Sequence, residues 1–136
     1  MNIIIFGGTG FIGRSLTEVF LEKGYRVCVV TRNYRKAAKL GNDLHLIEWD
    51  NQKPLSLVGE QLRNVDVVVN LAGESIGNRR WSNSVKQEIL ASRIRTTRAI
   101  VTSIKERIFQ PEVLINASAT GYYGPRGDDE ITESGK

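Results

Sequence analysis

Cysteine and histidine are almost missing from this chain, which has one of each. Cys28 lies in an apolar run and has no partner for an intrachain disulfide, so we expect a small buried hydrophobic side chain in a reducing compartment. His45 stands between two leucines with no second ligand, which argues against a metal site.

The sequence also lacks long apolar runs and a strong charge of one sign. No run is long enough to span a membrane, and the first residues, MNIIIFGG, lack the basic leader and cleavage site of a signal peptide. We therefore expect a cytoplasmic protein. The net charge of +4 is mild and spread along the chain, which does not favour nucleic acid, although an anionic ligand such as a phosphorylated cofactor fits it.

A length of 136 residues suits one domain, and we see no internal repeat, low-complexity tract or linker. Short apolar runs, continuous enough for buried strands, alternate with longer amphipathic stretches. The predicted strands are Asn2–Phe6, Arg26–Thr31, Leu44–Glu48, Val65–Asn70 and Val113–Ala117. The predicted helices are Phe11–Lys23, Arg35–Leu40, Leu55–Arg63 and Val85–Ile108, and the remainder from Gly121 to Lys136 is predicted to be a loop.

This alternation predicts an α/β fold, a Rossmann-like doubly wound parallel sheet in three layers, with strand order 3-2-1-4-5 and helices on both faces. Gly24 and Gly41 are placed to end the first two helices. Ser84 with Gln87 fits a capping box at the start of the long helix. The apolar side of that helix is predicted to be formed by Val85, Ile89, Ile100, Ile104 and Ile108.

A glycine-rich turn joins the first strand to the first helix and matches G-x-G-x-x-G. Glycines there allow a tight turn, close approach of a pyrophosphate and close packing of helix on strand, and the helix start attracts phosphate. The motif alone is weak, but the strand and helix around it are the required ones. The alternative is a turn without a ligand. The predicted cofactor-binding residues are Gly7, Gly8, Thr9, Gly10, Phe11, Ile12 and Gly13.

The end of the second strand bears on the kind of dinucleotide. An NAD enzyme usually has Asp or Glu there to hold the ribose 2′-hydroxyl, whereas this chain has Arg32, followed by Arg35 and Lys36. A guanidinium suits a 2′-phosphate, so we predict NADP(H), with NAD(H) as the alternative. The structural alternative is that these cations are solvated residues of a surface helix.

With these residues in place, the chain resembles the extended and atypical short-chain dehydrogenase/reductases. More narrowly, it resembles the epimerase family proteins, described as NAD-dependent epimerase/dehydratase or nucleoside-diphosphate-sugar epimerase. The similar segments cover nearly the whole chain: FGGTGFIG, VTR, EWD, VVVNLAGESIGNRRW, KQEILASRIRTTRAI, and NASATGYYG followed by TE. The resemblance implies that residues 1–136 form an NAD(P)-binding domain and that a substrate-binding C-terminal region is not in this chain.

The resemblance also implies roles for single residues. Asp50 would meet the adenine amino group, and the end of the fourth strand, Asn70, Leu71, Ala72 and Gly73, would line the cofactor. Asn70 has a second interpretation, a turn residue that bonds its own backbone, and both can hold.

At the reacting end, Ser118 would be the active-site Ser/Thr that hydrogen-bonds the substrate. Tyr122 or Tyr123 would border the substrate pocket, with no indication of which faces inward. The alternative is that all three only cap and pack.

Arg93 and a cluster of cations before the long helix each have a structural and a functional interpretation. Arg93 interrupts the apolar side of the long helix, where we expect an ion pair beneath the sheet rather than catalysis. Arg79, Arg80 and Trp81 form a cationic-aromatic cluster that could bind an anionic substrate or the cofactor, although an ordinary surface loop is the default. The long helix could also pair with its copy in a homodimer, as in related reductases.

The Tyr-x-x-x-Lys pair of short-chain reductases is absent from these 136 residues: Arg126 and Gly127 stand where lysine would follow Tyr122 and Tyr123. The motif would lie beyond Lys136, or the subfamily lacks it; we favour both explanations together. The leading hypothesis is an epimerase or oxidoreductase that uses NADP(H) for hydride transfer on a small polar, nucleotide-sugar-like substrate. The alternatives are a catalytically silent NADP(H)-binding sensor and a domain whose site has decayed.

Overall fold

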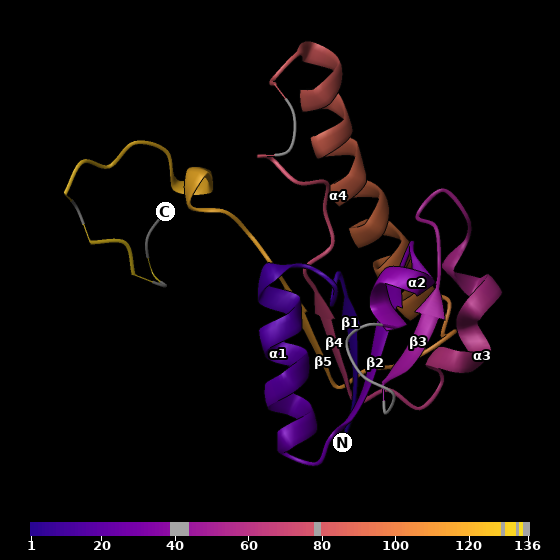
Figure 1. Ribbon diagram of the computed structural model, residues 1–136. Coiled ribbons are helices and arrows are strands. Elements are labelled where there is room, and N and C mark those ends of the chain that lie inside the picture. The colour runs from indigo at the N-terminus through magenta and orange to yellow at the C-terminus, as the bar shows by residue number, and fades with distance from the viewer. Residues whose placement is uncertain (39–43, 78–79, 129, 133, 135–136) are drawn as a thin grey trace.

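A five-stranded parallel sheet forms the centre of the computed structural model, which describes residues 1–38, 44–77, 80–128, 130–132 and 134 (Figure 1). The strand order is β3-β2-β1-β4-β5, so the predicted fold and order are confirmed. Each strand is parallel to its neighbours because a crossover brings the chain back to the same edge. The strands are β1 (Asn2–Phe6), β2 (Arg26–Thr31), β3 (His45–Glu48), β4 (Val67–Asn70) and β5 (Val113–Asn116).

The helices agree with most of the predictions. α1 (Phe11–Glu22) is followed by Gly24 at φ +74°, the left-handed conformation expected of a C-terminal glycine. The predicted helix 55–63 is a 3₁₀ turn, η2 (Leu55–Val58), followed by α3 (Gly59–Leu62). α2 (Tyr34–Ala37) begins one residue before the predicted Arg35, whereas the predicted end at Leu40 and the cap Gly41 lie outside the described residues. The remaining elements are α4 (Asn83–Lys105) and η3 (Thr120–Tyr123), a short turn in the predicted C-terminal loop.

Two apolar clusters hold the layers together. On one face of the sheet, Ile3, Ile5 and Val29 pack with Leu16 and Phe20 of α1. Phe11 at the start of α1 is 94% exposed, so it takes no part in this packing. The second cluster joins the other face to α4, η2 and α3 through Ile4, Phe6, Val68, Leu62 and Ile100. Each fully buried side chain of this size contributes on the order of 2 kcal/mol, so the centre of the sheet is well anchored.

The long helix differs from its prediction in its cap and in its buried face. Its N-cap is Ser82, whose hydroxyl accepts from the Val85 N–H at 3.3 Å, so the prediction of Ser84 is wrong. Ser82 has the extended backbone that a cap requires, whereas Ser84 is already helical. The helix ends at Lys105 and Arg107 has φ +58°, so Ile108 lies beyond it. The buried residues are mostly small and polar: Ser92, Thr96, Ile100 and Ser103.

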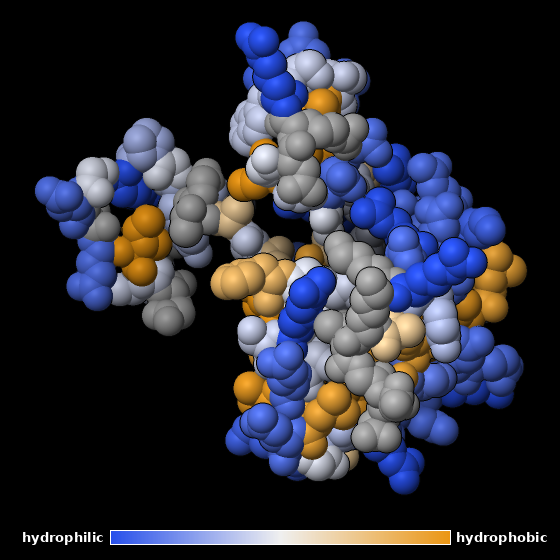
Figure 2. Space-filling view, viewed as in Figure 1, coloured by the Kyte–Doolittle hydropathy of each residue, from blue (hydrophilic) through white to orange (hydrophobic). Residues whose placement is uncertain are grey.

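The β5 edge is built differently from the centre. Val113, Leu114 and Ile115 are 46%, 40% and 51% exposed, so the expected helical cover on both faces holds for β1 and β4 but not for β5. Beyond β5 the described residues up to 128 leave the sheet and extend away from α1 and α4 (Figures 1 and 2). Among the described residues, no helix has the length and apolar character needed to cross a membrane.

Candidate functional site

A cavity of about 530 Å³ opens at the carboxyl edge of the sheet, where the ends of β1, β2 and β4 meet α4. Its volume lies within the range of small-molecule sites, and this edge is where open α/β sheets bind ligands. Seven predicted cofactor-binding residues line it: Gly7, Thr9, Gly10, Arg32, Leu71, Ala72 and Gly73. Nine lining residues were not among the predicted ones: Phe6, Val30, Thr31, Asn33, Trp49, Asn51, Glu74, Ser92 and Thr96.

Gly7 makes the tight turn at the floor of the cavity. It has φ +82°, and a Cβ there would lie 2.9 Å from the backbone carbonyl of Leu71. The turn is closed by the Gly10 N–H, which donates to the Gly7 carbonyl at 3.0 Å. A side chain at Gly7 would therefore be strained and would also collide with the next strand end.

Gly8 and Gly13 face away from the cavity and allow α1 to pack closely. A Cβ at Gly8 would lie 2.6 Å from Val29 Cγ2, and one at Gly13 would lie 2.4 Å from the Gly7 carbonyl oxygen. Thr17, one turn after Gly13, donates its hydroxyl to the Gly13 carbonyl at 2.7 Å. The glycines of the motif therefore divide into two that line the cavity and two that pack the helix on the sheet.

The start of α1 supplies backbone N–H groups at the glycine turn. Its N-cap is Gly10, which has no side chain to accept from the first turn. Arg14 donates its Nε to the Thr9 carbonyl at 3.0 Å and so fixes the loop from outside. Phe11 and Ile12 are 94% and 61% exposed and do not line the cavity. Unpaired N–H groups and the positive end of the helix dipole make this helix start suitable for an anion.

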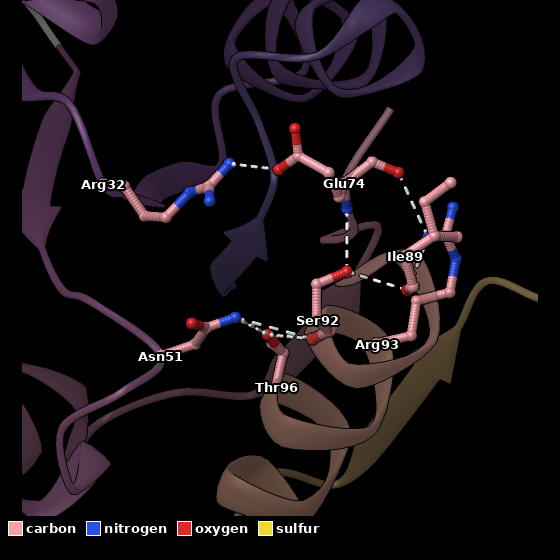
Figure 3. A network of polar contacts seen from close by, with 7 residues as sticks. All are labelled: Arg32, Asn51, Glu74, Ile89, Ser92, Arg93 and Thr96. Atoms are coloured by element: carbon pink, nitrogen blue, oxygen red, sulfur yellow. Dashed lines mark hydrogen bonds and ion pairs between the residues drawn. The ribbon is translucent and has the colours of Figure 1, made fainter. Parts of the chain in front are cut away.

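Arg32 and Glu74 form an ion pair at the rim of the cavity (Figure 3). Arg32 Nη2 lies 3.3 Å from Glu74 Oε2, and their side chains are 62% and 20% exposed. Arg32 follows β2 and Glu74 follows β4, so the pair connects the two strands that flank β1. The sequence offered a signal for Glu74, a charge directly after the small residues Ala72 and Gly73.

Asn51, the residue after the predicted Asp50, lines the cavity. Its Nδ2 donates to Thr96 Oγ1 at 3.3 Å and approaches the Ser92 carbonyl at 3.5 Å (Figure 3). Asp50 is exposed beside Lys53 in a neighbouring depression and accepts from the Gln52 N–H at 3.1 Å. A one-residue difference at the end of a strand therefore decides which polar side chain faces the cavity.

Two hydroxyls of α4, those of Ser92 and Thr96, form the opposite wall, and Arg93 of the same helix lies next to them. Ser92 Oγ accepts from the Glu74 N–H at 2.9 Å and donates to the Ile89 carbonyl at 2.9 Å. Arg93 Nη1 donates to the carbonyls of Glu74 and Ile89, each at 3.1 Å (Figure 3). The expected ion pair of Arg93 is therefore replaced by hydrogen bonds to two carbonyls. Ser92 and Thr96 are four residues apart on the same face of the helix, which is the signal that would have found them.

Asn70 is buried below the cavity and links three elements. Its Nδ2 donates to Asn116 Oδ1 at 2.6 Å and to Thr97 Oγ1 at 3.2 Å, so it joins β4 to β5 and α4. Its Oδ1 accepts from the Ala72 N–H at 3.2 Å. The second interpretation of Asn70, a turn residue that bonds nearby backbone, therefore matches these contacts.

The predicted catalytic residues lie apart from the cavity. Ser118 is exposed just beyond β5, and Tyr122 is 81% exposed with its ring edge-on to Tyr123 at 5.3 Å between centroids. None of the three lines the cavity. In the cationic-aromatic cluster, Trp81 donates its Nε1 to the Ile76 carbonyl at 2.7 Å, and Arg79 lies outside the described residues. In the described ranges, His, Cys, Asp and Glu gather in no group of three or more suited to a metal.

A Rossmann-type sheet with a glycine turn and an open helix start at its carboxyl edge defines a nucleotide-binding type of protein. Similarity to known proteins narrows this class. The family model of the NAD dependent epimerase/dehydratase family matches residues 3–136, and the chain belongs to that family.

Curated relatives carry the same family description. The chain is 38% identical over 133 residues to epimerase family protein YfhF of Bacillus subtilis (strain 168), with 98% of this chain and 42% of the relative covered. Epimerase family protein SH2119 of Staphylococcus haemolyticus is 37% identical over 124 residues, with 91% and 39% covered. The chain thus spans about two fifths of the length of these relatives.

Solved structures share the fold. Human epimerase family protein SDR39U1 (isoform 2), crystallised with NADPH, is 30% identical with a TM-score of 0.72, covering 93% of this chain and 39% of the human one. UDP-glucose-4-epimerase from Stenotrophomonas maltophila, with bound NAD and formylated UDP-arabinopyranose, is 19% identical with a TM-score of 0.79, covering 98% and 41%. At that identity the second structure supports the fold alone.

Proposed function

We propose that this protein binds NADP(H) and acts as an epimerase or oxidoreductase by hydride transfer on a small polar substrate of the nucleotide-sugar kind. The observation that carries the proposal is the cavity at the start of α1, where Gly7 and Gly10 keep side chains out of the turn, the N-cap has no side chain to accept from the first-turn N–H groups, and Arg32 stands at the rim. The NADPH of the human relative and the NAD of the bacterial epimerase support a nicotinamide dinucleotide.

The residues present fit such a group. The start of α1 would hold the pyrophosphate, because a Cβ at Gly7 would fill the turn and the N-cap Gly10 has no side chain of its own. Leu71, Ala72 and Gly73 would pass along the adenosine half, and Arg32 would meet a 2′-phosphate. Asp50 and Asn70 remain proposed neighbours of the cofactor from the resemblance, and Phe11 and Ile12 remain so from the glycine-rich turn, beside or below the cavity.

At the other end of the dinucleotide, Ser118 would hydrogen-bond a substrate hydroxyl or carbonyl, and Tyr122 or Tyr123 would border the substrate. The nicotinamide, when bound, supplies the hydride chemistry, and the protein supplies position and electrostatics. A tyrosine hydroxyl can donate or accept a proton, but no lysine follows either tyrosine at the spacing that lowers its pKa in short-chain reductases.

Calorimetric titration with NADPH and NADH tests the binding step. Micromolar binding of NADPH is expected. The variant Gly10→Asp should abolish most of it, because Asp is a favourable N-cap whose carboxylate would occupy the anion position itself. Asn64→Asp, an exposed change of the same charge away from the cavity lining, is the control and should bind normally. Absence of binding by both dinucleotides would disprove the proposal.

A second candidate, a sensor that binds the dinucleotide without turnover, is favoured by one observation. Ser118 and Tyr122 are exposed and lie outside the cavity that suits the cofactor. Incubation with NADPH and carbonyl substrates separates the two functions. Steady consumption of NADPH supports the enzyme, whereas micromolar binding with no consumption supports the sensor.

We also propose that the protein forms a homodimer through α4. Leu90 and Ile94, four residues apart on one face of this helix, are 60% and 44% exposed and offer an apolar strip to a second copy. Light scattering should give twice the chain mass, and Ile94→Glu should return it to that of a monomer. A monomeric unsubstituted protein would disprove the dimer.

A further inference from the structure

The Arg32–Glu74 ion pair places opposite charges at the side of the cavity where an adenosine ribose would lie. β1 lies between β2 and β4, so a pair that connects the ends of β2 and β4 stands beside the glycine turn after β1. Both side chains line the cavity, and their charged atoms are 3.3 Å apart (Figure 3). A group that reaches Arg32 from inside the cavity therefore also comes close to the carboxylate of Glu74.

Glu74 is the fixed member of the pair. Ser92 Oγ accepts from its N–H, and Arg93 Nη1 donates to its carbonyl. The preceding residue, Gly73, is packed against Arg93, because a Cβ there would lie 2.9 Å from Arg93 Cζ. The Glu74 side chain is 20% exposed and that of Arg32 is 62% exposed, so the carboxylate is the more buried partner.

The two side chains have opposite hydrogen-bonding abilities. A guanidinium only donates and suits the oxygens of a 2′-phosphate, whereas a carboxylate only accepts and suits the 2′-hydroxyl of NAD(H). In NAD-binding Rossmann proteins an acidic side chain near the end of the second strand accepts from that hydroxyl. Here the second strand ends in Arg32, and a carboxylate comes to the same place from the end of β4.

We infer that Glu74 is a specificity-determining residue, which accepts a hydrogen bond from the ribose 2′-hydroxyl of NAD(H) and disfavours the 2′-phosphate of NADP(H) that Arg32 attracts. The inference rests on the proposed dinucleotide binding. With both side chains present, both dinucleotides bind. The affinity for NADP(H) then exceeds that for NAD(H) by less than it would with Arg32 alone.

Calorimetric dissociation constants for NADPH and NADH, at one ionic strength, test the inference with Glu74→Gln. The variant should bind NADPH more tightly and NADH more weakly, so that the ratio of the two constants shifts by roughly tenfold, the effect of one hydrogen bond to a charged group. Glu60→Gln is the matched control. It removes the same charge from the surface ion pair with Arg63 and should leave the ratio unchanged.

The outcomes separate this inference from the proposed function. If the unsubstituted protein binds neither dinucleotide, the proposed function is wrong. If it binds both and Glu74→Gln leaves the ratio unchanged, or weakens both equally, Glu74 is only a structural residue and the inference alone is wrong. Should circular dichroism show that Glu74→Gln is unfolded, Glu74→Asp replaces it. In that variant the side chain is one methylene shorter, so the carboxylate lies farther from the ribose. The ratio of the NADPH and NADH dissociation constants should then move in the same direction to a smaller extent.

Discussion

The two predicted parts of the site lie in very different surroundings. Around the glycine turn, backbone atoms stand so close that a Cβ at Gly7 or Gly13 would lie 2.4–2.9 Å from its neighbours. Around β5, by contrast, Leu114 and Ile115 are exposed, and Ser118 and Tyr122 have open surroundings. The first region is determined by backbone packing, and the second presents side chains with few contacts to position them.

The two regions meet different requirements of the proposed chemistry. Binding of a diphosphate needs backbone N–H groups and a tight turn, which the β1–α1 unit builds from neighbouring residues. Positioning of a reacting group needs a side chain that is fixed by surrounding residues. Ser118 and Tyr122 lack such neighbours among the described residues, so the binding half of the proposed function rests on firmer geometry than the catalytic half.

The largest effect on stability is expected from Gly13→Ala, which adds a side chain inside the tightly packed glycine turn. The new Cβ would meet the Gly7 carbonyl oxygen at 2.4 Å and Gly8 Cα at 2.6 Å, and these are backbone atoms that cannot rotate away. We expect a loss of about 3 kcal/mol in the free energy of unfolding, measured in urea. Gly77→Ala is the control, because apart from its chain neighbours no atom of the described residues lies within 4 Å of its Cβ position. Equal stability of the two variants would show that the glycine turn is not tightly packed.

A smaller effect on stability is expected from a substitution at Asn70, which joins the glycine-turn region to β5. Asn70→Ala removes a buried amide together with its hydrogen bonds to Asn116, Thr97 and the Ala72 N–H, which should lower the free energy of unfolding by about 2 kcal/mol. Amide exchange in β5 should accelerate more than in β1, because β5 is an edge strand that pairs with β4 alone, whereas β1 pairs with a strand on each side. Asn64→Ala, at an exposed position, should change neither measurement. Uniform acceleration over the whole sheet would contradict the proposed link.

Arg32→Gln tests the rim of the packed region. It should weaken NADPH binding by roughly tenfold, because a hydrogen-bonded pair of charges is lost, and should change NADH binding much less. Arg26→Gln is the control, since Arg26 is the first residue of the same strand, at the end away from the cavity. Equal weakening of both dinucleotides would mean that Arg32 does not contact the 2′ position.

The sequence predicted the strands and their order because continuous apolar runs between amphipathic segments fix both. Prediction from the sequence failed where two residues that could serve as the N-cap of α4 stand close together. Ser82 and Ser84 are both acceptable caps, and only the backbone direction decides between them. The role of Asp50, whose neighbour Asn51 lines the cavity, stays a prediction. Prediction from the sequence also missed Ser92 and Thr96, because small polar residues on the buried face of α4 break the rule that polar residues face solvent.

The smallest effect concerns Cys28, which belongs to the packed region and, as predicted, is a buried small side chain. Burial raises the pKa of its thiol from 9.0 to about 12. The folded state therefore keeps a proton that the unfolded state loses above pH 9.0, so stability falls as the pH rises from 9.0 to 12. At pH 10 the loss should be about 1 kcal/mol. Unfolding in urea at pH 8 and pH 10 measures it, with Cys28→Ala as the variant that lacks this contribution. If both proteins lose the same stability between the two values, the thiol is not shielded from water and the strand is less tightly packed than the glycine turn beside it.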